Sequence, residues 1–245
     1  MRNVVQRVTE KPVRKIPHAI DVSLQRPYCR AKFDLPEDGF LFLFSFDFKS
    51  FAERKNPWAV IEAFQSAFMQ HSSPVGLVVK CFQGSQFPEK LGMLLELAAA
   101  DPRIIIIDKL LSREDVTGLQ SVCDAYVSLH RSEGLGLGMA ECMALGKPVI
   151  ATAYSGNLEF MTPENSCLVD YTMIPVKPGE YIDYEPCWLW ADADIGHAAA
   201  TMRRVVEDVA YRTQIGRSAK LHMAKHFNHQ VVAQAIQRRL AELAS

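Results

Sequence analysis

Residues 124–152 read DAYVSLHRSEGLGLGMAECMALGKPVIAT. A strand-like apolar run at 124–130 leads into a turn with three alternating glycines, and a helix-like run at 136–145 and a second strand-like run at 147–152 follow. Two strands joined by a helix lie parallel in one sheet, because parallel strands need a long crossover connection. The stretch therefore predicts a β–α–β unit with a glycine-rich turn between its first strand and its helix.

The same alternation of strand and helix extends toward the N-terminus. Strand-like apolar runs alternate with segments of helical periodicity, the strands at 40–46, 75–81 and 103–108 and the helices at 56–71, 88–100 and 112–123. Pro57 suits a first helical turn, and Ser112 suits an N-cap. Repeated units of this kind predict an α/β fold with a doubly wound, Rossmann-like parallel sheet. Ligands of such sheets bind at the carboxyl ends of the strands.

The pattern changes beyond residue 155. The segment 175–194 is rich in aromatic residues and proline, and it predicts an irregular excursion over the surface. The remainder, 194–244, predicts two or three amphipathic helices rich in Ala, Arg and Leu.

Composition narrows the class of protein. The 245 residues include 27 basic and 28 acidic side chains, and the net charge of −1 gives no general attraction to nucleic acid. The longest apolar runs are far shorter than the ~20 residues that a membrane span needs. The first residues lack the apolar segment of a secretory signal, and the six cysteines include no C-x-x-C pair. These features predict a cytoplasmic protein with free thiols.

Residues 1–38 differ from the rest of the chain. Within 1–32, eight basic side chains stand against two acidic ones, and prolines recur through the segment. We expect a solvated connector here and a globular domain at 39–245. The alternative is a positively charged contact with a membrane surface, which would place the protein at the periphery of the inner membrane.

The glycine-rich turn predicts an anion site. Backbone N–H groups are free at a helix N-terminus, and the helix dipole adds partial positive charge. Gly134, Gly136 and Gly138 would let a ligand approach the backbone and would allow unusual dihedral angles. Glu133 and Glu141 could accept hydrogen bonds from paired sugar hydroxyls. Amides for phosphate and carboxylates for hydroxyls together describe a nucleotide-sugar. A tight structural turn with two solvated glutamates is the alternative.

A family resemblance makes this hypothesis more specific. Seven residues lie between the two glutamates, and EGLGLGMAECMALGKPVIAT is similar to the E-x7-E region of retaining glycosyltransferases of family 4, which have the GT-B fold. Residues 46–64 resemble the first strand–loop–helix of the nucleotide-sugar half of those enzymes, and YSGNLEFM at 154–161 resembles their sugar-proximal glycine turn. These segments occur in the family's order between residues 40 and 170.

The resemblance implies a role for each matched residue. Glu133 would contact the hexose near its anomeric centre, and Glu141 would hold the ribose diol. Amides around Gly136, Leu137 and Gly138 would meet the diphosphate or the sugar. Lys55 matches the family's phosphate-binding lysine, whose charge would stabilise the leaving diphosphate without a metal ion or other cofactor.

One part of the family pattern is missing. Many members carry an arginine just after the first strand, where this chain reads SFDF at 45–48. Arg54, or Arg131 beside Glu133, is the candidate substitute.

Four further residues lie at expected strand ends or in the glycine turn. Gly156 and Asn157 belong to the turn that resembles the sugar-proximal one. His130 would be either a donor to the ligand or a buried histidine bonded within the protein. Lys80 would be either a second phosphate contact or a solvated strand end.

Two competing motifs are weaker. Asp192 and Asp194 form a D-x-D pair like the metal motif of the other glycosyltransferase fold, but they precede a helix, and Asp194 is better explained as its N-cap. GLGLG has the spacing G-x-G-x-G, whereas dinucleotide-binding folds use G-x-G-x-x-G. Neither a metal nor NAD is expected.

The resemblance covers one of the two domains of a GT-B enzyme. We expect the chain to be the C-terminal, donor half, which would transfer a hexose from a UDP- or GDP-sugar in polysaccharide or glycan synthesis. An N-terminal half-domain would be its partner and would supply the acceptor site. The alternative is a nucleotide-sugar binding module without turnover of its own.

Overall fold

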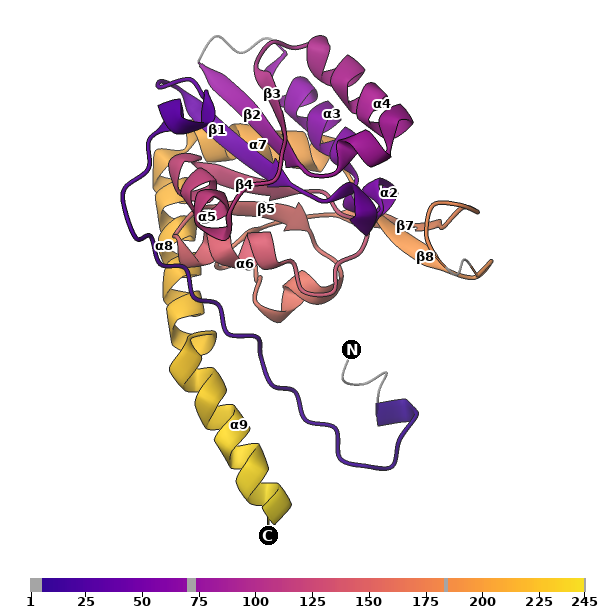
Figure 1. Cartoon of the computed structure of the whole chain (residues 1–245), viewed down its shortest axis with the longest axis vertical. Coiled ribbons are helices and arrows are strands. Elements are labelled where there is room, and N and C mark those ends of the chain that lie inside the picture. Colours follow the sequence, from indigo (N-terminus) through magenta and orange to yellow (C-terminus); the bar gives the residue numbers. More distant parts are fainter. Residues whose placement is uncertain (1–5, 70–73, 183–184, 245) are drawn as a thin grey trace.

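The computed structural model describes residues 6–69, 74–182 and 185–244 (Figure 1). Arg2 of the basic segment and the last two residues of the helix predicted at 56–71 lie outside this part of the chain.

A parallel sheet forms the centre of the molecule. It has six strands in the order β3-β2-β1-β4-β5-β6. Every neighbouring pair of strands in this sheet is parallel. The bounds are β1 (Phe40–Ser45), β2 (Val75–Cys81), β3 (Ile104–Asp108), β4 (Ala125–Ser128), β5 (Val149–Thr152) and β6 (Cys167–Val169). The predicted doubly wound parallel sheet is confirmed.

The direction of winding reverses between β1 and β4. From β1 the chain moves outward through β2 and β3, and it then returns to place β4 on the other side of β1. In doubly wound folds the connections that leave such a pair go to opposite faces, and ligands bind between them at the carboxyl ends. Lys55 follows β1 and Glu133 follows β4, so both candidate residues lie at this point.

Helices cover both faces of the sheet (Figure 1). The bounds are α3 (Pro57–Phe68), α4 (Pro88–Ala99) and α7 (Ile195–Glu207) on one face, and α5 (Arg113–Val122), α6 (Leu137–Ala144) and α8 (Val209–His226) on the other. β1 shows why both faces are needed. Phe42 and Phe44 pack into the core on the first face, and Leu41 and Leu43 pack into the core on the second. A strand buried on both faces reads as a continuous apolar run.

Helix starts follow the predicted capping. The Ser112 hydroxyl accepts a hydrogen bond from the Asp115 amide at 3.0 Å, and the Asp194 carboxylate accepts one from the His197 amide at 2.9 Å. Pro57 occupies the first turn of α3. Three helices, α7, α8 and α9 (His229–Ala244), follow Asp194, which confirms the helical prediction for 194–244.

The prediction of an irregular segment at 175–194 is wrong at its ends. β7 (Tyr171–Pro175) and β8 (Leu189–Ala193) pair antiparallel as a hairpin that projects from the body (Figure 1). Each of these strands is short, and within the described residues the two form a sheet of their own, separate from the parallel sheet. A strand of this kind depends on its partner more than on its own composition, which is why the sequence pattern does not reveal it.

The prediction of a solvated segment at 1–38 is wrong for three side chains. Ile20, Phe33 and Leu35 are buried in the core on the α6 and α8 face. Phe33 ends a short 3-10 helix, η1 (Arg30–Phe33). The side chain of Arg30 donates to the Asp124 carboxylate at 2.7 Å. The division into a connector at 1–38 and a domain at 39–245 stays a prediction.

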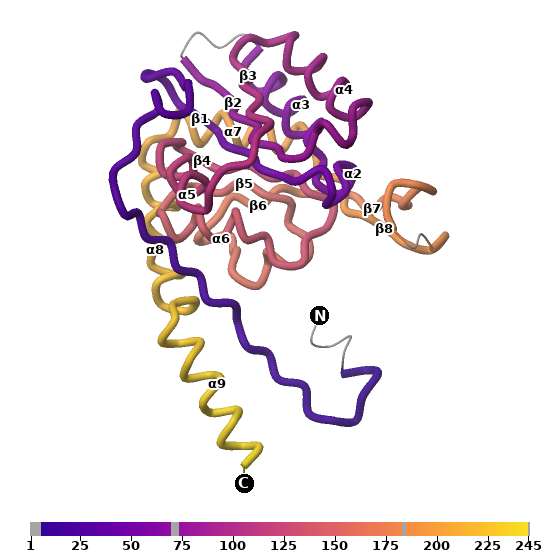
Figure 2. Tube along the Cα trace, in the orientation of Figure 1, coloured from indigo at the N-terminus to yellow at the C-terminus, as the bar shows by residue number. Residues whose placement is uncertain are grey.

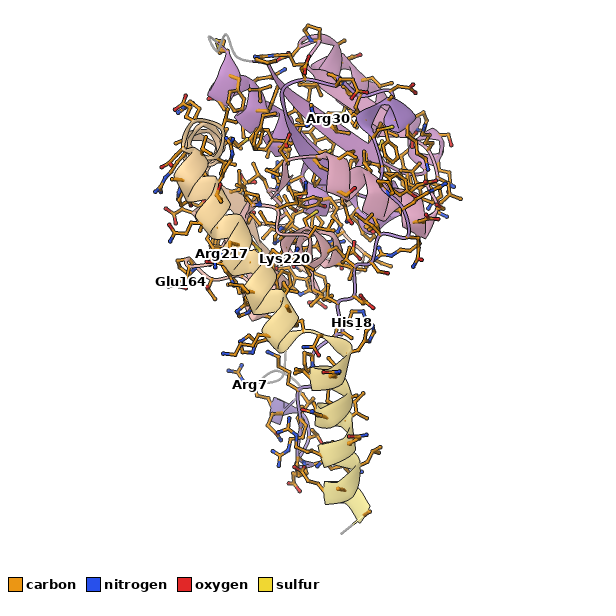
Figure 3. All side chains as sticks on the ribbon, turned by 90° about the vertical axis from the view of Figure 1, so that its left-hand side faces the viewer. Arg7, His18, Arg30, Glu164, Arg217 and Lys220 are labelled. Atoms are coloured by element: carbon orange, nitrogen blue, oxygen red, sulfur yellow. The ribbon has the colours of Figure 1, made fainter. Side chains whose placement is uncertain are left out.

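The last helix extends away from the body, and the N-terminal segment runs beside it (Figure 2). The Ile20 amide donates to the Phe227 carbonyl at 2.8 Å, and Arg14 and Glu242 form an ion pair at 3.4 Å. Figure 3 shows Arg7 and His18 beside this helical arm. Within the described ranges, none of the helices has both the length and the apolar character needed to cross a bilayer.

Candidate active site

Two cations lie on a short helical turn after β1. Arg54 and Lys55 are the last two residues of this short helix, α2 (Ala52–Lys55). Its flanking residues, Phe51 and Asn56, have φ of 63° and 55°, which non-glycine residues rarely adopt. Such strain persists only where the surroundings enforce it, and it is often found at functional sites.

Contacts with the loop after β4 enforce this conformation. The Arg54 guanidinium donates to the Ser50 carbonyl at 3.1 Å and to the Ser132 carbonyl at 2.6 Å. The Arg131 amide donates back to the Arg54 carbonyl at 2.8 Å. The loops that follow the two central strands are therefore joined across the sheet edge.

Glu133 lies between the two cations. Its Oε1 accepts a hydrogen bond from the Lys55 ammonium, and its Oε2 lies 3.4 Å from the Arg54 guanidinium. Burial by itself raises the pKa of Glu133, but the charge and hydrogen bond of Lys55, with the charge of Arg54, outweigh burial and hold that pKa below its ordinary value. The carboxylate is therefore ionised at neutral pH.

The predicted glycine turn closes over the same loop. The Gly156 amide donates to the Glu133 carbonyl at 3.0 Å, and the Ser155 hydroxyl accepts from the Glu133 amide at 2.8 Å. A Cβ at Gly156 would lie 2.1 Å from the Gly134 carbonyl oxygen, so only glycine allows this approach. Ser155 has φ of 76°, a third strained non-glycine residue at the site.

The three glycines of the turn have different roles. Gly136 has φ of 87° and is the N-cap of α6, whereas a Cβ at Gly138 would lie 2.9 Å from the Tyr126 hydroxyl. A Cβ at Gly134 would meet nothing within 4 Å. Gly134 and Gly138 do not have a positive φ, so the expectation of unusual dihedral angles is confirmed only at Gly136. Because Gly136 has no side chain to cap α6, the amides of Leu137 and Gly138 stay available to an anion.

Glu141 lies on α6 and points toward α5. Its Oε2 accepts a hydrogen bond from the Gln120 amide at 2.8 Å, and its Oε1 lies 2.6 Å from the Arg113 guanidinium. Glu141 is buried, whereas 59% of the Arg113 side chain is exposed. The alternative of two solvated glutamates is contradicted, because both carboxylates are at most 9% exposed and ion-paired.

Sequence reasoning missed Arg113 and Gln120. They are seven positions apart, and such a spacing places them on one face of a helix. A polar pair on one face of α5 was therefore a usable signal, but the packing of that face against Glu141 could not be read from it.

His130 and Asn157 are buried and bonded within the protein. The His130 Nε2 lies 3.2 Å from both the Tyr154 carbonyl and the Asn157 Oδ1, and its Nδ1 lies 3.2 Å from the Ser128 hydroxyl. Two acceptors at Nε2 favour the tautomer with hydrogen there. Burial lowers the pKa of His130, so the ring is neutral. This geometry favours the second of the two interpretations, a histidine that positions the loop.

Lys80 and Arg131 also face protein groups. The Lys80 ammonium is buried at the end of β2 and donates to the Cys81 carbonyl at 2.8 Å, and burial lowers its pKa. The Arg131 guanidinium donates to the Asp192 carboxylate at 2.8 Å, and it faces the hairpin. Arg54 and Arg131 are the two candidate substitutes for the family's arginine. Within the described part of the chain, Arg54 contacts Glu133, whereas Arg131 pairs with Asp192. Among the residues that the structure describes, no three His, Cys, Asp or Glu side chains gather as a metal site would require.

Comparison with known proteins places the chain in a family by sequence. Residues 26–172, more than half of the chain, match the family described as glycosyl transferases group 1. None of the curated proteins matches the chain by sequence.

Solved structures show the same fold. Sucrose-phosphate synthase from Thermosynechococcus elongatus is 22% identical, with a TM-score of 0.67, over 95% of this chain and 53% of that chain. The C-terminal domain of the group 1 family glycosyl transferase LpcC from Francisella tularensis is 19% identical, with a TM-score of 0.61, over 85% of this chain and 100% of that one. Anabaena HepE, in complex with UDP-glucose, is 18% identical, with a TM-score of 0.63, over 87% of this chain and 51% of that one. The chain thus spans about half the length of the first and third of these proteins, and its fold is that of the C-terminal domain of GT-B enzymes.

Proposed function

The chain belongs to the group 1 glycosyl transferases, and from that premise we propose that it is the donor half of a retaining glycosyltransferase. It would bind a nucleoside-diphosphate sugar, linked to UDP or GDP, and transfer the hexose to an acceptor hydroxyl. The observation that carries this proposal is the placement of Arg54, Lys55 and Glu133 together at the β1–β4 edge, beside the uncapped N-terminus of α6.

The chemistry needs positive charge at the diphosphate. When the bond between the anomeric carbon and the diphosphate oxygen breaks, the electron pair leaves with the diphosphate. Lys55, Arg54 and the amides of Leu137 and Gly138 would stabilise the charge that develops there. Glu133 holds the two cations in place before the ligand arrives, and on binding its carboxylate would turn to the hexose hydroxyls. The acceptor oxygen would form the new bond to the anomeric carbon, and its proton would pass to the departing diphosphate oxygen.

Buried acceptor oxygens support a diol next to this anion site. Neither Glu141 Oε1 nor Gln120 Oε1 has a hydrogen-bond donor in suitable geometry, and both are buried. Ribose hydroxyls are donors that would satisfy them. Glu141 Oε1 is covered by the Arg113 side chain, which is exposed and can leave without disturbing the core. We therefore assign the ribose to Glu141 and Gln120.

A second candidate is a nucleotide-sugar binding module without turnover. It is favoured by the state of Glu133, whose lowered pKa and two cationic partners make it a poor proton acceptor at neutral pH. Both candidates require the same donor site, so they differ only in transfer.

The partner half-domain has a suitable surface on α9. Val232, Ile236, Leu240 and Leu243 lie along one side of this helix, and the last three are 42–65% exposed. We propose that an N-terminal half-domain covers this side and contributes to the acceptor site. Cytoplasmic location, peripheral contact of the basic segment 1–32 with the inner membrane, and a role in polysaccharide or glycan synthesis stay predictions.

Calorimetry with UDP, GDP, UDP-glucose and GDP-mannose would test donor binding by the whole chain. We expect saturable binding of at least one of these compounds. Lys55→Ala should weaken it by about tenfold or more, because a charged contact to phosphate is lost. Lys225→Ala is the matched control, since Lys225 is exposed on α8, far along the chain from the site.

Release of free hexose from the bound nucleotide-sugar would separate the two candidates. Hydrolysis or transfer, by this chain alone or together with an N-terminal half-domain, supports the enzyme, and tight binding without either in both settings supports the module. Failure of every UDP and GDP compound to bind would overturn both.

A further inference from the structure

A cavity of about 480 Å³ lies beside the donor site, between the loops at the sheet edge and the β7–β8 hairpin. Arg54, Ser132 and Tyr154 contribute from the sheet edge. The hairpin contributes an aromatic and aliphatic wall that includes Tyr181 and Trp188. The donor interactions assigned above use none of the hairpin residues, so this cavity is unassigned.

The aromatic wall is held by ring contacts. The Tyr181 ring centroid lies 4.7 Å from that of Phe51, 6.2 Å from that of Trp188 and 6.0 Å from that of Trp190. Trp190 is buried, and the Arg131 guanidinium lies 5.8 Å from its ring. Trp188 is 37% exposed, so part of its surface is open to a ligand.

The base of the hairpin is fixed to the donor site. The Ala191 amide donates to the Arg131 carbonyl at 3.1 Å, and Arg131 is paired with Asp192. Tyr154, at the end of β5, packs its ring against that of Tyr171 at 5.2 Å. Arg54 lines the cavity and also contacts Glu133. A ligand in the cavity would therefore lie next to the hexose of the bound donor.

We propose that this cavity binds a sugar ring of the acceptor glycan, an inference that rests on the proposed function. A pyranose has faces of C–H groups and a rim of hydroxyls. Its slightly positive C–H hydrogens are attracted to the negative faces of aromatic rings such as Trp188 and Tyr181. Its hydroxyls would meet the hydroxyl of Tyr154 and polar groups at Ser132 and Arg54.

The mixed lining argues against other occupants. A lipid chain needs a continuously apolar wall, but Arg54, Ser132 and two tyrosines interrupt it. The volume lies within the range of small-molecule pockets, about 300–1,000 Å³, rather than that of the broad surfaces that proteins use. Transfer also requires an acceptor hydroxyl close to the anomeric carbon, which this position provides.

Ligand-observed saturation-transfer NMR on the whole chain would test the proposal. The probes are the α- and β-methyl glycosides of glucose, galactose, mannose and N-acetylglucosamine, and their 1,4-linked disaccharides, each with and without UDP. We expect saturable binding of at least one probe. Trp188→Ala should weaken that binding by about tenfold while it leaves UDP affinity within about twofold. Leu221→Ala, at another exposed apolar side chain on α8, is the matched control.

Tryptophan fluorescence provides a second measurement. The chain has three tryptophans, and in Trp58→Phe only Trp188 and Trp190 would emit. A bound glycoside should change that emission with the same affinity as in NMR.

The outcomes separate this proposal from the donor assignment. Binding of UDP with no binding of any glycoside, or glycoside binding that Trp188→Ala leaves unchanged, would overturn the cavity assignment alone. Glycoside binding without any nucleotide binding would overturn the donor assignment and, with it, the acceptor role of the cavity.

Discussion

His130 couples the loop after β4 to pH. Its pKa is lowered by burial from the ordinary value of 6.5, so below pH 6.5 the unfolded chain binds more protons at this residue than the folded chain does. The contribution of neutral His130 to the free energy of unfolding is therefore present above pH 6.5, and it is lost as the pH falls below that value. Between pH 7.5 and 5.5 the unmodified chain should lose about 1 kcal/mol more unfolding free energy than His130→Gln.

Urea unfolding at the two pH values would measure this difference. His222, whose pKa is also lowered by burial, is present in both proteins, so its contribution cancels. Equal losses in the two proteins would mean that the folded state accommodates a charged His130.

Substitutions of Glu141 and Arg113 should change nucleotide affinity in opposite directions. If the ribose replaces Arg113 at Glu141 Oε1, Arg113→Ala removes a competitor, and nucleotide affinity should rise by about two- to fivefold, the worth of an exposed ion pair. Glu141→Gln removes the charged acceptor and should weaken binding by about tenfold or more. Calorimetry with the tightest-binding nucleotide measures both, and a loss of affinity in Arg113→Ala would show instead that Arg113 contacts the ligand.

Among the elements, the contact between the loop after β4 and the turn at Ser155–Glu159 is the most sensitive to an added methyl group. Gly156→Ala would place a Cβ against the Gly134 carbonyl, and we expect a loss of about 1–3 kcal/mol of unfolding free energy together with weaker nucleotide binding. Gly92→Ala is the comparison. Gly92 lies inside α4, with nothing within 4 Å of the added Cβ, so alanine should stabilise by about 0.5–1 kcal/mol.

Chemical denaturation of both variants measures whether each substitution raises or lowers the free energy of unfolding. An unchanged free energy of unfolding in Gly156→Ala would mean that the loop after β4 and the turn at Ser155–Glu159 separate easily. Their contacts around Glu133 would then not preorganise the site.

For the whole molecule, the helical arm should be separable from the donor site. Within the described part of α9, Val232 is the buried residue, and the Arg14–Glu242 pair is exposed. Deletion of residues 229–245 should lower the unfolding free energy by no more than about 3 kcal/mol and should leave nucleotide affinity within about twofold. Thermal unfolding and calorimetry measure these values, and loss of cooperative unfolding would show that α9 is part of the core.

The site was only partly readable from the sequence. Lys55 and Glu133 are 78 positions apart, and the sequence predicts each of them separately, because each follows a predicted strand and matches a family motif. That the two form an ion pair depends on β1 and β4 being neighbours. Arg113 and Gln120 had no motif, and they gained significance only because α5 packs against α6.

The amino-acid order by itself determined the alternation of strands and helices, the parallel sheet, the helix caps at Ser112 and Asp194, and the glycine turn. Each of these follows from local periodicity, capping chemistry or backbone freedom within a few residues. The tertiary structure alone decided which carboxylate meets which cation, the burial of Ile20 and Phe33, and the β7–β8 hairpin with its aromatic cavity. These features depend on contacts between segments far apart in the chain, and local pattern carries no information about such contacts until the sheet order is known.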